Sequence, residues 1–113
     1  MNYDESTIEE LNGSHLQGTI TATPYHTLVK IFGEPHDYRG HRGEKIDVEW
    51  MLKFADGTVA SIYNWKDGIN YLQNSGTPVE QISQWNVGGH SRESYAQVLA
   101  TVLGHKETQP SLF

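Results

Sequence analysis

The stretch IDVEWMLKFADGTVASIYNWK, residues 46–66, decides the fold. Two segments rich in β-branched and aromatic residues flank Asp56-Gly57, a dipeptide that favours a hairpin turn because both residues tolerate a positive φ. The sequence therefore predicts a β-hairpin with strands at 46–54 and 58–66.

A two-residue loop at Asp56-Gly57 sets the predicted register. One face then carries the opposed pairs Phe54–Val59, Leu52–Ser61, Trp50–Tyr63 and Val48–Trp65. We expect this aromatic face to pack in the core. The other face carries the pairs Met51–Ile62, Glu49–Asn64 and Asp47–Lys66. It is mixed in character, which suits either a solvated face or an interface.

The segments around the hairpin predict further elements. Leu16–Ala22 is expected to be a strand, and Gln84–Val87 another. Apolar residues at helical spacing predict one helix at about 24–32, ended by Gly33, and a second at about 92–103, capped by Ser91. The order indicates an α+β fold: a small antiparallel sheet built around the hairpin, with both helices packed on one face.

The 113 residues suit one domain, which we place at 15–105, between a flexible acidic arm at 1–14 and a C-terminal tail at 106–113. The absence of Cys excludes disulfides and thiolate chemistry. The net charge of -6 argues against bulk nucleic acid as a partner. No apolar run approaches the ~18 residues of a membrane span.

The segment WNVGGHS, at 85–91, is the first candidate ligand-binding site. Two glycines let a backbone approach a ligand, and the free N–H groups of a following helix attract an anion. The candidate ligand-binding residues are Trp85, Gly88, Gly89, His90 and Ser91, with Lys66 and Asn64 as second choices. The alternatives are a tight strand-to-helix turn at the glycines and a surface ion pair between Lys66 and Asp47.

Six histidines and several carboxylates do not form a recognised metal or catalytic motif. His36 and His41 lie in one polar loop, and we interpret them as solvated. Asp47 and Glu49 lie on one strand face, where they are more typical of a solvated surface than of an acid–base pair. The sequence thus predicts no catalytic residue, no metal site and no cofactor.

Three strings in this order and spacing resemble a family of small accessory proteins of tailed bacteriophages and prophages. They are HTLVKIFGEP (His26–Pro35), DVEWMLKFADGTVASIYNWKDG (Asp47–Gly68) and WNVGGHS (Trp85–Ser91). The resemblance covers about residues 23–103. It implies a protein that acts in the bacterial host cytoplasm and antagonises a host system. The family has no established activity from which catalytic residues could be transferred.

Three functions are compatible with these features. The first is an anti-defence protein that sequesters a nucleotide-type signalling molecule. The second is a protein–protein inhibitor of a host defence enzyme, anchored by Met51, Ala60 and Ile62. The third, which we rank last, is a small metal- or histidine-dependent phosphoesterase. We also expect part of the aromatic surface to be buried between identical subunits of a homo-oligomer.

Overall fold

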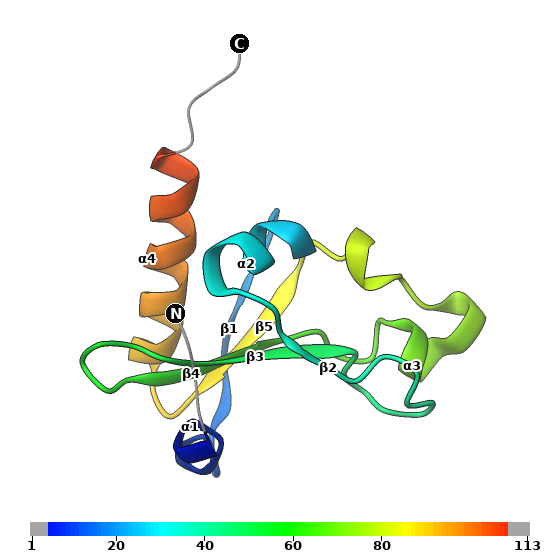
Figure 1. The fold of residues 1–113 in the computed structure, drawn as a ribbon, viewed down its shortest axis with the longest axis horizontal. Helices are drawn as coiled ribbons and strands as arrows, with labels where there is room; N and C mark the ends of the chain where they lie inside the picture. Colours follow the sequence, from blue (N-terminus) through cyan, green and yellow to red (C-terminus); the bar gives the residue numbers. More distant parts are fainter. Residues whose placement is uncertain (1–4, 109–113) are drawn as a thin grey trace.

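The computed structural model describes residues 5–108, which form a five-stranded antiparallel sheet flanked by helices (Figure 1). The strands are β1 (His15–Ile20), β2 (His36–Asp37), β3 (Val48–Lys53), β4 (Val59–Tyr63) and β5 (Trp85–Gly89). The helices are α1 (Glu5–Glu10), α2 (Tyr25–Phe32), α3 (Ile69–Leu72) and α4 (Arg92–Thr108), with 3-10 helices η1 (Gln73–Ser75) and η2 (Val79–Gln81). The predicted α+β class is confirmed.

The strand order is β1-β5-β4-β3-β2, so the last strand lies between the first strand and the hairpin. Helices α2 and α4 lie on one side of the sheet and α1 on the other, where it contacts β3 (Figure 1). We call the side of α2 and α4 the inner face and the opposite side the outer face. The two predicted helices are confirmed, together on the inner face.

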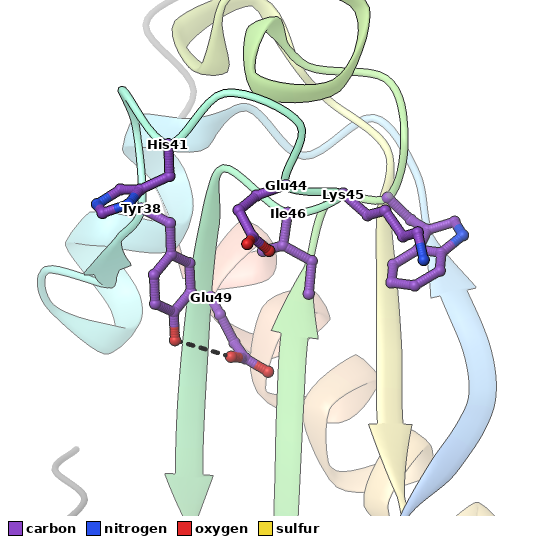
Figure 2. A pocket seen from close by; sticks show the side chains of 7 residues that line it. Tyr38, His41, Glu44, Lys45, Ile46 and Glu49 are labelled. Carbon is purple, nitrogen blue, oxygen red and sulfur yellow. Dashed lines mark hydrogen bonds between the residues drawn. The ribbon is translucent and has the colours of Figure 1, made fainter.

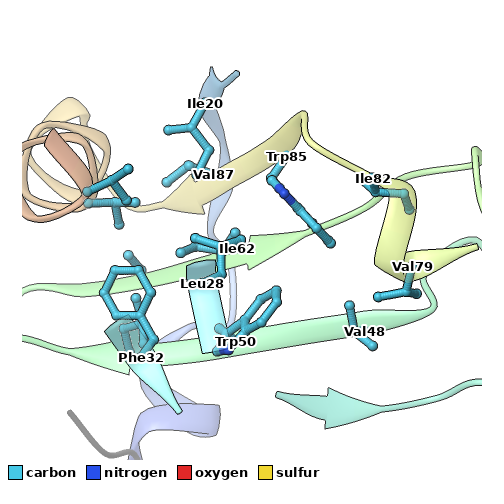
Figure 3. Close-up of a cluster of buried hydrophobic side chains, with 14 of the residues drawn as sticks. Ile20, Leu28, Phe32, Val48, Trp50, Ile62, Val79, Ile82, Trp85 and Val87 are labelled. Carbon is cyan, nitrogen blue, oxygen red and sulfur yellow. The ribbon is translucent and has the colours of Figure 1, made fainter. Parts of the chain in front are cut away.

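Two tryptophans form the centre of the core on the inner face (Figure 3). The rings of Trp50 and Trp85 meet edge to face at 5.4 Å. Each indole N–H finds a carbonyl at 2.8 Å, Gly33 O for Trp50 and Thr23 O for Trp85, so neither buried ring leaves its polar atom unsatisfied. Around them pack Ile20, Leu28, Phe32, Val48, Ile62, Val79, Ile82 and Val87.

The hairpin is confirmed, but its predicted two-residue loop is wrong. Phe54 N donates to Thr58 O at 2.8 Å, so the loop has three residues, 55–57. Gly57 has φ 91°, as the last residue of such a loop requires. The observed pairs are Lys53–Val59, Leu52–Ala60, Met51–Ser61, Trp50–Ile62 and Glu49–Tyr63.

This change of one residue in the register exchanges the two faces of β4. Ala60 and Ile62 are fully buried in the core, so the predicted partner surface that joined them to Met51 is wrong. Trp65, predicted to be in the core, is 45% exposed, whereas Asn64, predicted on the other face, is 1% exposed.

The N-terminal part of the domain also differs from the prediction. Residues 5–10 of the predicted flexible arm form α1 instead. Thr7 in this helix is buried, and Glu10 Oε1 forms a salt bridge with Lys53 Nζ at 2.9 Å. Residues 1–4 of the predicted arm lie outside the described residues.

At the C-terminal end, α4 continues through Gly104 to Thr108, past the predicted end at 103. One glycine inside a helix costs only about 1 kcal/mol. Lys106 in the last turns donates to Ala22 O at 2.9 Å, which ties this end of the helix to the segment after β1. The predicted tail therefore starts within the helix, and residues 109–113 lie outside the described part.

Candidate functional site

A pocket of about 540 Å³ lies where β3 and the end of the hairpin meet the loop 38–46 (Figure 2). This volume falls in the range of small-molecule sites. Its lining residues are Tyr38, His41, Glu44, Lys45, Ile46, Glu49 and Trp65. We call it the Trp65 pocket.

The buried side chain of Asn70 holds the loop that forms one wall of the Trp65 pocket. Asn70 Oδ1 accepts Gly40 N at 3.0 Å, and its Nδ2 donates to Tyr38 O at 2.8 Å and Ile46 O at 3.2 Å. Its own carbonyl accepts Gly43 N at 2.7 Å. Four hydrogen bonds from one residue thus join the loop to α3, which fixes the position of this wall.

Asn64 joins the start of β3 to the end of the hairpin. Its Oδ1 accepts the N–H groups of Asp47 at 2.8 Å and Val48 at 3.2 Å, and its Nδ2 donates to the carboxylates of Asp47 and Asp67, both at 2.9 Å. Asp47 also accepts Asn70 N at 3.2 Å. Asn64, predicted to contact a ligand, is committed to this buried network.

The same network excludes two predictions about Asp47. Its side chain is 1% exposed and bonds to amide groups, so the predicted surface pair with Lys66 is wrong. Asp47 and Glu49 also do not share a solvated face. Asp47 is buried, whereas Glu49 lies on the outer face and lines the Trp65 pocket. The physical reason is that the chain bends at Lys45 and Asp47 and β3 begins only at Val48, so the alternation of β3 does not extend to Asp47.

One side of the site is cationic, because two lysine ammonium groups lie there over two aromatic rings. The ammonium groups of Lys45 and Lys66 lie 5.7 and 5.8 Å from the centroid of the Trp65 ring, and Lys66 Nζ lies 5.7 Å from that of Tyr71. Within residues 5–108 neither lysine forms a salt bridge. Both ammonium groups are therefore available to an anion beside an exposed indole.

Lys66 has an unusual backbone, with φ 59°. The left-handed region costs a residue with a Cβ about 1–2 kcal/mol. Lys66 follows the end of β4 at Tyr63, and its ammonium group lies beside the rings of Trp65 and Tyr71. Left-handed non-glycine residues are found frequently at functional sites.

A half-buried carboxyl forms the opposite side of the pocket. Glu49 Oε1 accepts the Tyr38 hydroxyl at 3.2 Å, as the dashed line in Figure 2 marks. Burial raises the pKa of Glu49, although the Tyr38 hydrogen bond offsets part of the shift. Burial and the nearby Glu49 raise the pKa of Tyr38 to about 12 and also raise the pKa of Tyr63.

Replacing Glu49 by Gln is expected to remove a pH-dependent contribution to stability. Because the pKa is raised on folding, the contribution is complete below the ordinary value of 4.5 and is lost as the pH rises through the raised value. Urea unfolding across this range should show that wild-type stability declines relative to E49Q. E34Q, at an exposed glutamate, is the matched control. A constant difference between wild type and E49Q would contradict the shift.

The first three predicted ligand residues lie in strand β5, which extends the strand predicted at 84–87 through both glycines. Trp85 is 1% exposed and offers no free ring face. A Cβ on Gly88 would lie 2.7 Å from Ser61 Oγ, and one on Gly89 only 2.1 Å from Ser94 Oγ. The two glycines thus serve close packing within the sheet and beneath α4, rather than a tight turn between the strand and the helix.

His90 and Ser91 follow β5 at the opposite end of the hairpin from the Trp65 pocket. They line a separate pocket of about 340 Å³ with Glu10, Val59 and Ser94. Ser91 Oγ accepts Glu93 N at 3.3 Å, which confirms its predicted role as the cap of α4. The seven predicted ligand residues are therefore dispersed. Lys66 has an exposed side chain beside the Trp65 pocket, whereas the side chain of Asn64 is buried.

Within residues 5–108, no three side chains among His, Asp and Glu gather where they could hold a metal ion. His41 lines the Trp65 pocket, whereas His90 lines the separate pocket. The same range contains no helix with the length and apolar character needed to cross a bilayer.

Comparison of the chain with protein-family models, curated proteins and solved structures finds no match. The site must therefore be interpreted from its own chemistry. Sequence reasoning missed Tyr38, Lys45, Glu49 and Trp65 as members of one site. The available signal was Trp65 itself, since a three-residue hairpin loop places it outside the core.

Proposed function

We propose that this protein binds a small anionic ligand of the nucleotide type in the Trp65 pocket and sequesters it. The observation that carries the proposal is the exposed Trp65 ring, with two lysine ammonium groups within 6 Å of its centroid and no salt bridge to either within residues 5–108. An indole offers a stacking surface to a base, and the ammonium groups offer charge-assisted hydrogen bonds to phosphate.

Local charge supports an anionic ligand despite the net charge of -6. Arg39 is not available to such a ligand, because it is paired with Asp37 at 2.7 Å and Glu80 at 2.8 Å. Lys45 and Lys66 remain, and Lys66 N donates to Lys45 O at 2.8 Å, which holds their backbones side by side. Both ammonium groups lie within 6 Å of the centroid of one ring, so together they supply positive charge beside the pocket.

The resemblance to phage accessory proteins supplies the proposed biological role. A phage protein that retains a host signalling nucleotide would keep that signal from its effector. Such a role needs tight binding and no bond cleavage, so it requires only the complementary walls described above. We propose anti-defence sequestration in the bacterial cytoplasm on this basis.

Ligand binding can be measured by isothermal titration of ribonucleoside 5′-monophosphates and cyclic dinucleotides. We expect at least one probe to bind, and K45Q and K66Q each to weaken it by about tenfold, the effect of losing about 1.4 kcal/mol from a charge-assisted hydrogen bond. K30Q, at an exposed lysine of α2, is the matched control and should bind as wild type. Equal affinities for all four proteins would contradict the site.

Trp65 itself should report binding. It is the exposed member of the three tryptophans, since Trp50 and Trp85 are 2% and 1% exposed. We expect a stacked base to quench part of the intrinsic fluorescence, and W65F to abolish this change while calorimetry shows weaker binding. Quenching that persists in W65F would place the ligand elsewhere.

A second candidate function is inhibition of a host protein. Besides Trp65, the residues Ile69, Tyr71 and Leu72 of α3 are each at least 40% exposed, and such a group of apolar side chains often marks a protein interface. Cross-linking in infected cells would distinguish the two functions. A host protein that is recovered with wild type and K45Q but not with L72D would favour the inhibitor.

A further inference from the structure

The Trp65 pocket contains a carboxyl group whose role an anionic ligand alone does not explain. Glu49 lies among the lining residues together with Lys45. In the part of the chain that the structure describes, the Tyr38 hydroxyl is the hydrogen-bond donor to Glu49 Oε1, and no Lys, Arg or His forms a salt bridge with this carboxyl. The carboxyl therefore retains acceptor capacity for the hydrogen-bond donors of a ligand.

A half-buried carboxylate requires donors, and it repels a phosphate. The group that a ligand places against Glu49 must therefore be neutral and must carry O–H or N–H donors. The backbone from Lys45 to Glu49 spans at most about 14 Å, so one ligand of nucleotide size can reach both side chains. The two sides of the pocket thus select a molecule that is anionic at one end and rich in donors at the other.

A ribose satisfies both conditions, because its 2′ and 3′ hydroxyls are neutral donors close to the phosphate. Carboxylates accept such hydroxyls in dinucleotide-binding folds. We infer that Glu49 accepts hydrogen bonds from the ribose hydroxyls of a ribonucleotide whose phosphate lies against Lys45 and Lys66. This inference rests on the proposed function and makes the pocket selective for ribonucleotides over deoxyribonucleotides.

Calorimetry on the full-length protein tests this selectivity with matched probes. Each ribonucleoside 5′-monophosphate is compared with its 2′-deoxy counterpart, for wild type and for the near-isosteric variant E49Q. We expect wild type to bind the ribonucleotide at least about tenfold more tightly, the effect of a hydrogen bond to a charged group, and E49Q to lose most of that preference. Circular dichroism establishes that E49Q is folded, and the wild-type comparison does not depend on the variant.

Two results would overturn the inference while leaving the proposed function intact. One is equal binding of ribose and deoxyribose probes by wild type, with K45Q still weaker than K30Q. The other is tighter binding of the ribonucleotide by E49Q, as expected if Glu49 only repels the phosphate. If no probe binds to wild type, both the inference and the proposed function fail.

Discussion

Replacing Asn64 by Asp is expected to lower the free energy of unfolding by at least about 3 kcal/mol. The amide of Asn64 donates to the carboxylates of Asp47 and Asp67, and its oxygen accepts two backbone N–H groups. An aspartate of the same shape loses both amide donors and adds a third carboxylate at a position that is 1% exposed. A buried charge without a compensating cation is among the most destabilising changes.

Urea unfolding measures this loss, and two further variants separate its causes. N74D makes the same chemical change at an exposed position of η1 and should stay within about 0.5 kcal/mol of wild type. N64A removes the hydrogen bonds without adding charge, so we expect an intermediate loss. If N64D and N74D unfold at the same urea concentration, the proposed role of the buried network is wrong.

Replacing Gly89 by Ala is expected to cost about 3 kcal/mol or more, through overpacking beneath α4 and a lost hydrogen bond. The added Cβ would lie 2.1 Å from Ser94 Oγ and 2.2 Å from Ser94 Cβ, so Ser94 must move. That movement breaks the bond from Ser94 Oγ to Val59 O, which is 2.7 Å long and buried. The first turn of α4 would lose its contact with the sheet.

Replacing a second glycine by alanine, at position 104, is expected to stabilise the protein. Gly104 lies inside α4, and a Cβ there would have no atom within 4 Å. G104A should therefore stabilise the protein by about 0.5–1 kcal/mol, because alanine loses less entropy in a helix. The double variant G89A/S94G, which removes the clashing Cβ, should recover part of the loss. Equal melting temperatures for G89A and G104A would refute the packing argument.

Local sequence signals were sufficient for the hairpin and for helices α2 and α4, but not for α1. Asp56-Gly57 between two aromatic segments indicated the hairpin, and helical spacing of apolar residues indicated α2 and α4. The α+β class and the antiparallel sheet follow from these elements. They could be predicted because each depends on residues near one another in the chain.

The register of the hairpin depended on whether its loop has two or three residues. Two- and three-residue loops both accept Asp-Gly, and local preference does not distinguish between them. The choice is made by the core, where Ala60 and Ile62 bury on the inner face with Trp50. A shift of one residue in the register moves every side chain of a strand to the other face of the sheet. The three-residue loop therefore buries Asn64 and exposes Trp65.

The sequence by itself determined the helices α2 and α4, the hairpin and the α+β class, because these follow from turn residues and from the spacing of apolar residues. Only the tertiary structure decided the candidate site, which joins residues from the loop 38–46, from β3 and from the end of the hairpin. Those residues meet because Asn64 and Asn70 satisfy backbone groups from segments 16 to 32 residues away. Such long-range partners leave no local pattern, so buried polar bonding rather than periodicity determines where the Trp65 pocket forms.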